Sequence, residues 1–224
     1  MTTNQRNLPD YTHKDEVHNS ITHFVGFLFG IIVLILFVYY EIKYPSLRMR
    51  MYPFYIYVFT MMFMFFNSGF YHSRKLGSKS RCIMRMVDHS DIYLFVAGTY
   101  TPICIYGITN SSISTALLII EWVSAGLGII FTLVGLNHKV LKFFAFAIYL
   151  IGGWSLIVFY PLNIGLEFSV FLFILIGGIV YTIGAILYGV GKKIIWFHTI
   201  FHYFILVAAI LQFVGVWFLL NQII

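Results

Sequence analysis

Two histidines share one helical face of an otherwise apolar stretch near the C-terminus. They are His198 and His202 in the sequence IIWFHTIFHYFI, residues 194–205. Side chains four residues apart lie one above the other on a helix, so the two imidazoles face the same way. Neutral imidazole is a preferred zinc ligand, but histidines at the ends of apolar helices also snorkel or form hydrogen bonds. The pair alone leaves both interpretations open.

Three further polar residues have the types that would complete a metal site. Ser68 and His72 share a helical face in NSGFYH, and Asp88 opens the stretch VDHSDIYLFVAGTYTP. Three imidazoles with a fourth position left to water form the ligand set of a catalytic zinc site. We predict His72, His198 and His202 as the ligands, with Asp88 as the base and Ser68 as an orienting group for the water. The alternative is a polar network that ties the helices together without a metal.

A second group of polar residues precedes the first apolar stretch. Glu16, Ser20 and His23 in DEVHNSITHFVG fall near one face of a helix, at spacings of four and three residues. Two interpretations are open for them, a polar cap that leads into the first span and a role beside the metal site.

Polar residues close to Asp88 or inside a span need separate explanations. Asp91 follows Asp88 by three residues and can share its face, as a partner acid or as an orienting group. His89 is a minor candidate, because on a helix it points roughly 100° away from Asp88. Glu121 lies within an apolar stretch and is expected to be an interfacial or packing residue.

The composition indicates an integral membrane protein. The chain has 224 residues, of which 60% are hydrophobic and 10% charged. A helix that crosses a bilayer needs about 20 apolar residues, because its backbone polar groups must be satisfied internally. Seven stretches qualify, at about residues 22–40, 53–72, 89–108, 113–136, 142–160, 168–189 and 198–220. We therefore predict an all-α, multi-pass bundle of seven transmembrane helices in the cell membrane, with a polar N-terminal segment at 1–20 and a transmembrane domain at 21–224.

The distribution of Lys and Arg predicts the orientation of this bundle. If the N-terminus is cytoplasmic, eleven basic residues share its side: Arg6, Lys14, Arg74, Lys75, Lys79, Arg81, Arg85, Lys139, Lys142, Lys192 and Lys193. Only Lys43, Arg48 and Arg50 fall on the opposite side. The excess favours a cytoplasmic N-terminus and an external C-terminus, and it places all five predicted site residues toward the cytoplasmic leaflet. The same distribution explains the net charge of +6 without a nucleic-acid partner.

Six sequence motifs follow one another along the chain and together extend over about residues 15–220. They are NSITHFVG, SGFYH, DHSDIYLFVAGTYTP, AIYLIGGW, GGIVYTIGAILYGVGKK and FHTIFHYFILVAA. In order and spacing these motifs resemble the hemolysin III family. This family is similar to the progestin and adiponectin receptors and, more distantly, to alkaline ceramidases. The superfamily consists of seven-helix membrane proteins thought to be metal-dependent hydrolases.

The resemblance implies roles for individual residues. It assigns zinc to His72, His198 and His202, and it places Asp88 and Ser68 close to the metal. The family also has an acid before its first span, which matches Glu16. Asp91 is a departure, since the family usually has a small residue there, and a second carboxylate could compete with Asp88 for the role of base.

The expected function is hydrolysis of an amide or ester bond in a lipid-like substrate that arrives from the membrane. The alternative is a non-enzymatic protein with a structural zinc, either membrane-perturbing and pore-forming or a sensor of membrane lipid state. A pore predicts a polar stripe along several spans, whereas the polar residues of this chain concentrate at one end.

Overall fold

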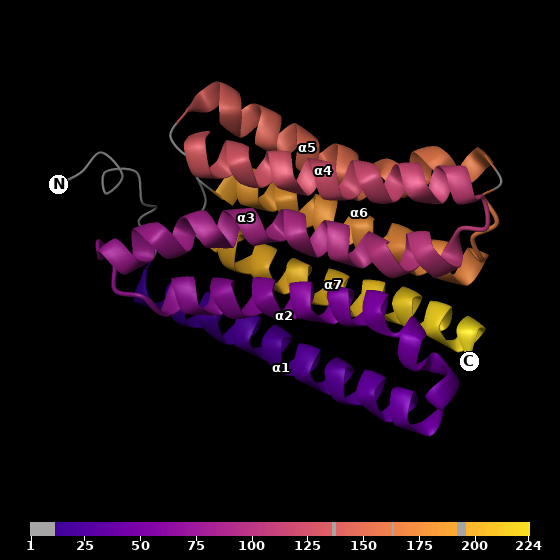
Figure 1. Cartoon of the computed structure of the whole chain (residues 1–224). Coiled ribbons are helices and arrows are strands. Elements are labelled where there is room, and N and C mark those ends of the chain that lie inside the picture. The colour runs from indigo at the N-terminus through magenta and orange to yellow at the C-terminus, as the bar shows by residue number, and fades with distance from the viewer. Residues whose placement is uncertain (1–11, 136–137, 163, 192–195) are drawn as a thin grey trace.

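The chain folds into long helices that lie side by side (Figure 1). The computed structural model describes residues 12–135, 138–162, 164–191 and 196–224. Within these ranges the α-helices are α1 His13–Lys43, α2 Tyr52–Ser73, α3 Lys79–Pro102, α4 Ser111–Gly135, α5 Lys139–Phe159, α6 Phe168–Gly191 and α7 Phe197–Ile223. Shorter helical segments are η1 Pro45–Arg50, η2 Ile103–Gly107 and η3 Tyr160–Leu162. Arg6, Lys192 and Lys193, which enter the predicted orientation, lie outside the described residues.

Six of these helices are long and apolar enough to cross a membrane. They are α1, α2, α4, α5, α6 and α7, which makes the chain a multi-pass integral membrane protein. The predicted third span, 89–108, overlaps the second half of helix α3, which is not among the six. Five charged residues between Lys79 and Asp91 make the first half of α3 polar. Its apolar part begins only after Asp91 and continues into η2.

Contacts between chain segments define two ends of the bundle. At one end, the Arg50 guanidinium donates to the Ile223 carbonyl oxygen over 3.1 Å, and the Thr109 amide donates to the Ile164 carbonyl over 3.0 Å. At the other end, Glu16 of α1 pairs with Arg81 of α3. Consecutive helices therefore run in alternating directions. The starts of α1, α3 and α7 meet the ends of α2 and α6 at this second end, called the histidine end below.

Helices α1 and α3 begin before the spans predicted from hydropathy. Thr12 caps α1 through a capping box with Asp15, so the helix starts at His13 rather than near residue 22. Ser78 caps α3 by accepting the Arg81 backbone N–H at 3.2 Å, so this helix starts at Lys79 rather than near residue 89. These extra turns are polar, and they carry Glu16 and Asp88 on rigid helices.

Small residues let α1 approach α2 closely. A Cβ atom added at Gly26 would overlap the Phe65 ring, and one added at Gly30 would overlap the Met62 side chain. Phe65 in turn packs against His23, with ring centroids 5.3 Å apart. The close packing of α1 on α2 thus supports a residue at the histidine end.

Candidate metal centre

The three histidines predicted as ligands lie together. His72 comes from α2, and His198 and His202 come from the first turns of α7. One ring nitrogen from each can be chosen so that all three lie within 4.8 Å of one another. The Nε2 atoms of His198 and His202 are 2.9 Å apart. Three imidazole nitrogens at this separation can hold a metal ion, and this donor set suits the transition metals that prefer nitrogen ligands.

Burial of the cluster is uneven. The His72 and His202 side chains are buried in the bundle, whereas His198 is partly exposed. His198 lies in the first turn of α7, at the margin of the histidine end. A molecule that reaches the cluster from outside the bundle would therefore pass His198 first.

Glu16 connects His72 to a buried arginine. Its Oε2 atom lies 2.7 Å from His72 Nδ1, and its Oε1 atom contacts the Arg81 guanidinium. A carboxylate only accepts hydrogen bonds, so His72 Nδ1 carries the hydrogen and Nε2 is the nitrogen left with a lone pair. Arg81 compensates the buried carboxylate. Of the two interpretations open for Glu16, the structure favours a role beside the site.

His23 stands beside His202. Its Nε2 atom contacts His202 Nδ1, and the two ring centroids are 4.3 Å apart. Because Nδ1 of His202 is engaged there, its Nε2 faces His198. A hydrogen bond to the far nitrogen of a ligand imidazole fixes the ring's tautomer and orientation. Ser20, the third member of this group, instead ties α1 to α2 by donating to the Gly69 carbonyl over 2.9 Å.

Ser68 and Asp88 reach the same region from two helices. Ser68 is buried on α2, one turn before His72. The Asp88 carboxylate, on α3, lies close enough to the Ser68 hydroxyl and to His72 to interact with both. Its side chain is 15% exposed. The structure thus brings both predicted water-handling residues to the histidine cluster, while their roles stay predictions.

His89 is closer to Asp88 than its helical direction suggested. The His89 Nδ1 atom lies 3.5 Å from Asp88 Oδ2, and its Nε2 atom lies 3.4 Å from the Tyr188 hydroxyl. The imidazole bends back along α3 and links Asp88 to α6. His89 therefore neighbours the acid, and Tyr188, which it contacts, also packs against the His198 ring, with ring centroids 5.3 Å apart.

Asp91 and Glu121 occupy different surroundings. Asp91 is buried one turn beyond Asp88, next to Asn67 of α2. Among the described residues, neither Asp91 oxygen has a hydrogen-bond partner. Glu121 on α4 accepts a 2.6 Å hydrogen bond from the Ser155 hydroxyl on α5. This contact agrees with the predicted packing role of Glu121, away from the histidine end.

Sequence reasoning did not identify Arg81 as part of the site. It was counted only as one of several loop charges, whereas its guanidinium is fully buried against Glu16 and stacks on the Tyr71 ring. The available signal was Glu16 itself, because an acid at the entry to a membrane helix needs a partner.

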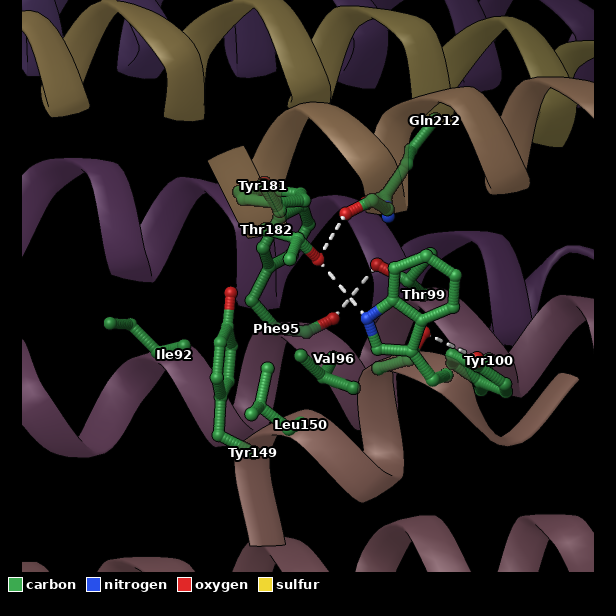
Figure 2. A pocket seen from close by; sticks show the side chains of 13 residues that line it. Ile92, Phe95, Val96, Thr99, Tyr100, Tyr149, Leu150, Tyr181, Thr182 and Gln212 are labelled. Carbon is green, nitrogen blue, oxygen red and sulfur yellow. Dashed lines mark hydrogen bonds between the residues drawn. The ribbon is translucent and has the colours of Figure 1, made fainter. Parts of the chain in front are cut away.

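A small cavity lies deeper in the bundle, between α3, α5, α6 and α7 (Figure 2). Its volume is about 40 Å³, enough for only a few water molecules. In its wall the Trp154 indole N–H donates to the Thr182 hydroxyl over 3.1 Å. Gln212, which also lines it, follows His202 by about 15 Å of helix. The cavity is thus separate from the histidine cluster, and it is too small for a lipid.

Comparison with known proteins reveals similarity over nearly the whole chain. A family model described as "Haemolysin-III related" matches residues 11–213. A protein of Bacillus subtilis (strain 168) named "Hemolysin-3 homolog" is 33% identical over 209 residues, which cover 93% of this chain and 95% of that protein. "Hemolysin-3" of Bacillus cereus is 32% identical over 206 residues, covering 92% and 91% of the two chains. The matched region contains all five predicted site residues.

Proposed function

Since the chain belongs to the hemolysin III family, we propose that it is a zinc-dependent hydrolase of an amide or ester bond in a membrane lipid. The observation that carries this proposal is the convergence of His72, His198 and His202, with Asp88 and Ser68 beside them. Three imidazoles that leave one coordination position open match catalytic zinc sites, whereas structural zinc sites usually have four protein ligands.

The histidine cluster would hold the zinc, and its neighbours would orient the ligands. Zinc held by three imidazoles polarises a carbonyl and makes a water molecule acidic enough to act as a nucleophile near neutral pH. Glu16 contacts Nδ1 of His72, and His23 contacts Nδ1 of His202. Both buried neighbours thereby limit rotation of the ligand rings.

Asp88 and Ser68 would manage the attacking water. We assign Asp88 as the acceptor of its proton, because this carboxylate combines proximity to His72 with partial access to solvent. Ser68 would orient the same water through its hydroxyl. Asp91 is the less suitable base, because it lies one turn deeper and adjoins Asn67.

The bundle would place this chemistry at the cytoplasmic face of the cell membrane. The described basic residues Lys14, Arg74, Lys75, Lys79, Arg81 and Arg85 cluster near the histidine end, against Lys43, Arg48 and Arg50 near the other. The positive-inside rule then favours a cytoplasmic N-terminus. We include α3 as a seventh span, because α2 and α4 flank it (Figure 1) and the chain that continues from it through η2 reaches Thr109, which adjoins Ile164 at the opposite end of the bundle.

Metal analysis tests the site first. Purified protein is expected to contain about one zinc per chain, because a three-histidine cluster holds one ion. His198→Ala and His202→Ala should lose it, since two imidazoles bind zinc far more weakly than three. Metal content measured by mass spectrometry provides the check. A metal-free wild-type protein, prepared without chelators in the presence of zinc, would remove the site from the proposal.

Turnover of lipid amides and esters then tests the reaction. Asp88→Asn should keep its zinc but lower turnover by about 100-fold to 10,000-fold, the usual contribution of a general base. Asp91→Asn is the matched control, one turn away on the same helix, and should retain both zinc and turnover. Equal loss in the two variants would show that Asp88 has no special role as the base.

The names of the two relatives favour a second candidate, membrane lysis. Leakage of a dye from liposomes tests it. Leakage that persists in the metal-free His198→Ala and His202→Ala variants would support lysis and would separate it from the hydrolase. A single chain offers little space for a pore, since the cavity between α3, α5, α6 and α7 admits only a few water molecules. A lytic form would therefore require several chains.

A further inference from the structure

We infer that the side-chain amide of Asn19 binds the polar group of the lipid at the histidine end, and that this group pairs an acyl carbonyl with a nearby free hydroxyl. This inference rests on the proposed function, and it narrows the substrate class within it. Asn19 is not among the site residues predicted from the sequence.

Asn19 lies between the two residues of α1 that contact clustered histidines. It follows Glu16 by three residues and precedes His23 by four, so all three share one side of α1. Glu16 contacts His72 of α2, and His23 contacts His202 of α7. The Asn19 side chain is fully buried there, with 0% exposure.

The neighbours of Asn19 show which way its side chain faces. Ser20, the next residue, turns to α2 and donates to the Gly69 carbonyl over 2.9 Å. His18, the preceding residue, turns to α7, where its Nδ1 lies 3.4 Å from the Tyr203 hydroxyl. Asn19 projects between these two directions, which is toward the space shared by α2 and α7. His72, His198 and His202 come from these same two helices.

The Asn19 amide lacks protein partners. Neither its oxygen nor its nitrogen has a hydrogen-bond partner within the described part of the chain. The adjoining hydroxyls are satisfied, since Ser20 bonds to Gly69 and Thr22 donates to the His18 carbonyl over 2.7 Å. Buried polar groups are nearly always hydrogen-bonded, because leaving them unpaired is costly. A bound molecule would supply both missing partners.

The two atoms of the amide restrict what that molecule can be. A carboxamide presents an N–H donor and a carbonyl acceptor side by side, and exchanging the two atoms leaves the same requirement. The ligand must therefore present an acceptor next to a donor. An acyl carbonyl supplies the acceptor. In a trans secondary amide the N–H points away from that carbonyl, so a hydroxyl on a nearby carbon must supply the donor. Acyl lipids whose neighbouring oxygens are all alkylated or phosphorylated lack this donor.

A pair of lipids that differ only at this hydroxyl tests the inference. The probes are N-dodecanoylethanolamine and its O-methyl ether, and affinity is measured by calorimetry on zinc-loaded protein in nanodiscs. Asp88→Asn serves as the background, so that turnover does not consume the probe. We expect the hydroxyl lipid to bind about fivefold to tenfold more tightly than the ether, the usual worth of one hydrogen bond.

Substitution of Asn19 should remove this preference. In Asn19→Leu and Asn19→Ala the two lipids should bind equally, while zinc content stays at the level of the background protein and reports an intact site. Thr22→Val is the control, because its hydroxyl already bonds within α1, and it should keep the preference. A preference that survives both Asn19 substitutions, or that Thr22→Val abolishes equally, overturns the inference, as does failure of both probes to bind.

The binding experiment, together with the turnover assay on the wild-type protein, distinguishes failure of the inference from failure of the proposed function. A wild-type protein that prefers the hydroxyl lipid through Asn19 but never cleaves a lipid would refute the hydrolase and leave Asn19 as a ligand-binding residue. A protein that cleaves lipids but shows no hydroxyl preference that depends on Asn19 would support the hydrolase and refute the role of Asn19.

Discussion

Glu16 joins three helices through one carboxylate. It accepts from His72 Nδ1 at 2.7 Å with one oxygen and contacts Arg81 with the other. A buried acid in this position determines which nitrogen of His72 faces the cluster, and the Arg81 guanidinium pairs with the second oxygen of that acid. The affinity of the cluster for zinc should therefore depend on a residue that does not touch the metal.

Glu16→Gln should weaken zinc binding by about 10-fold to 100-fold, the usual cost of losing a partner of a ligand imidazole. The amide is a poorer acceptor, and it no longer neutralises Arg81. Competition with a fluorescent chelator measures the change. Asp15→Asn is the matched control, since within the described ranges this adjacent acid bonds to Thr12 in the capping box and not to the histidines. Equal loss of affinity in both variants would contradict the role assigned to Glu16.

The sequence was sufficient to place the histidines at one depth, but not to pair their neighbours. His72, His198 and His202 each lie at the edge of an apolar stretch, on the same side of the predicted membrane. Hydropathy along the sequence is enough to show this. The contacts of His23 and Glu16 depend on the rotation of α1 about its axis, which tertiary packing decides. Arg81 was missed because a basic residue in a polar run resembles a solvated loop charge, and burial cannot be seen from composition.

The helices themselves were predictable in part. Hydropathy located six membrane helices, because an apolar run of about 20 residues is typical of a helix that crosses a bilayer. It did not locate the first turns of α1 and α3, because these turns are polar. The capping residues Thr12 and Ser78 were the available signal for those starts. That α3 crosses the membrane stays a prediction, because the charged residues in its first half offset the apolar residues in its second half.

Close packing of α1 on α2 gives a test at the scale of elements. Gly26→Ala should lower the free energy of unfolding by about 1–3 kcal/mol, because the added Cβ would overlap the Phe65 ring. Gly126→Ala on α4 is the control. No atom of the described residues lies within 4 Å of the added atom there, and the change should be neutral or stabilising by about 0.5–1 kcal/mol. Thermal unfolding in detergent compares them. Equal effects would show that the α1–α2 contact can relax at no cost.

At the scale of the whole molecule, alternating helices place the site and the C-terminus at opposite ends. Contacts of Arg50 with Ile223, and of Thr109 with Ile164, gather four chain segments at the end away from the histidines. In a membrane, this separation would place the histidine cluster and the C-terminus on opposite sides. The basic residues then decide which compartment each one faces.

Labelling of single cysteines tests this arrangement, in a background that lacks Cys82 and Cys104. Lys75→Cys, between α2 and α3, should react only with reagents that reach the cytoplasm. Met49→Cys and Ser112→Cys should react with impermeant reagents from outside, because η1 and the start of α4 lie at the other end. All three side chains are exposed. Labelling of Lys75→Cys and Ser112→Cys from one side would remove α3 from the spans, and a reversed pattern would invert the orientation.

The contact between His23 and His202 joins the first helix to the last, across 179 residues of sequence. Membrane helices are synthesised in order, so α1 and α2 must wait for α7 before their histidines meet the other two. A nascent chain cannot assemble the cluster early, however much metal the cell contains. If the cluster binds the proposed zinc, loading with metal would report that insertion of the whole chain is complete. Quality control that detects a metal-free chain would detect an unfinished one.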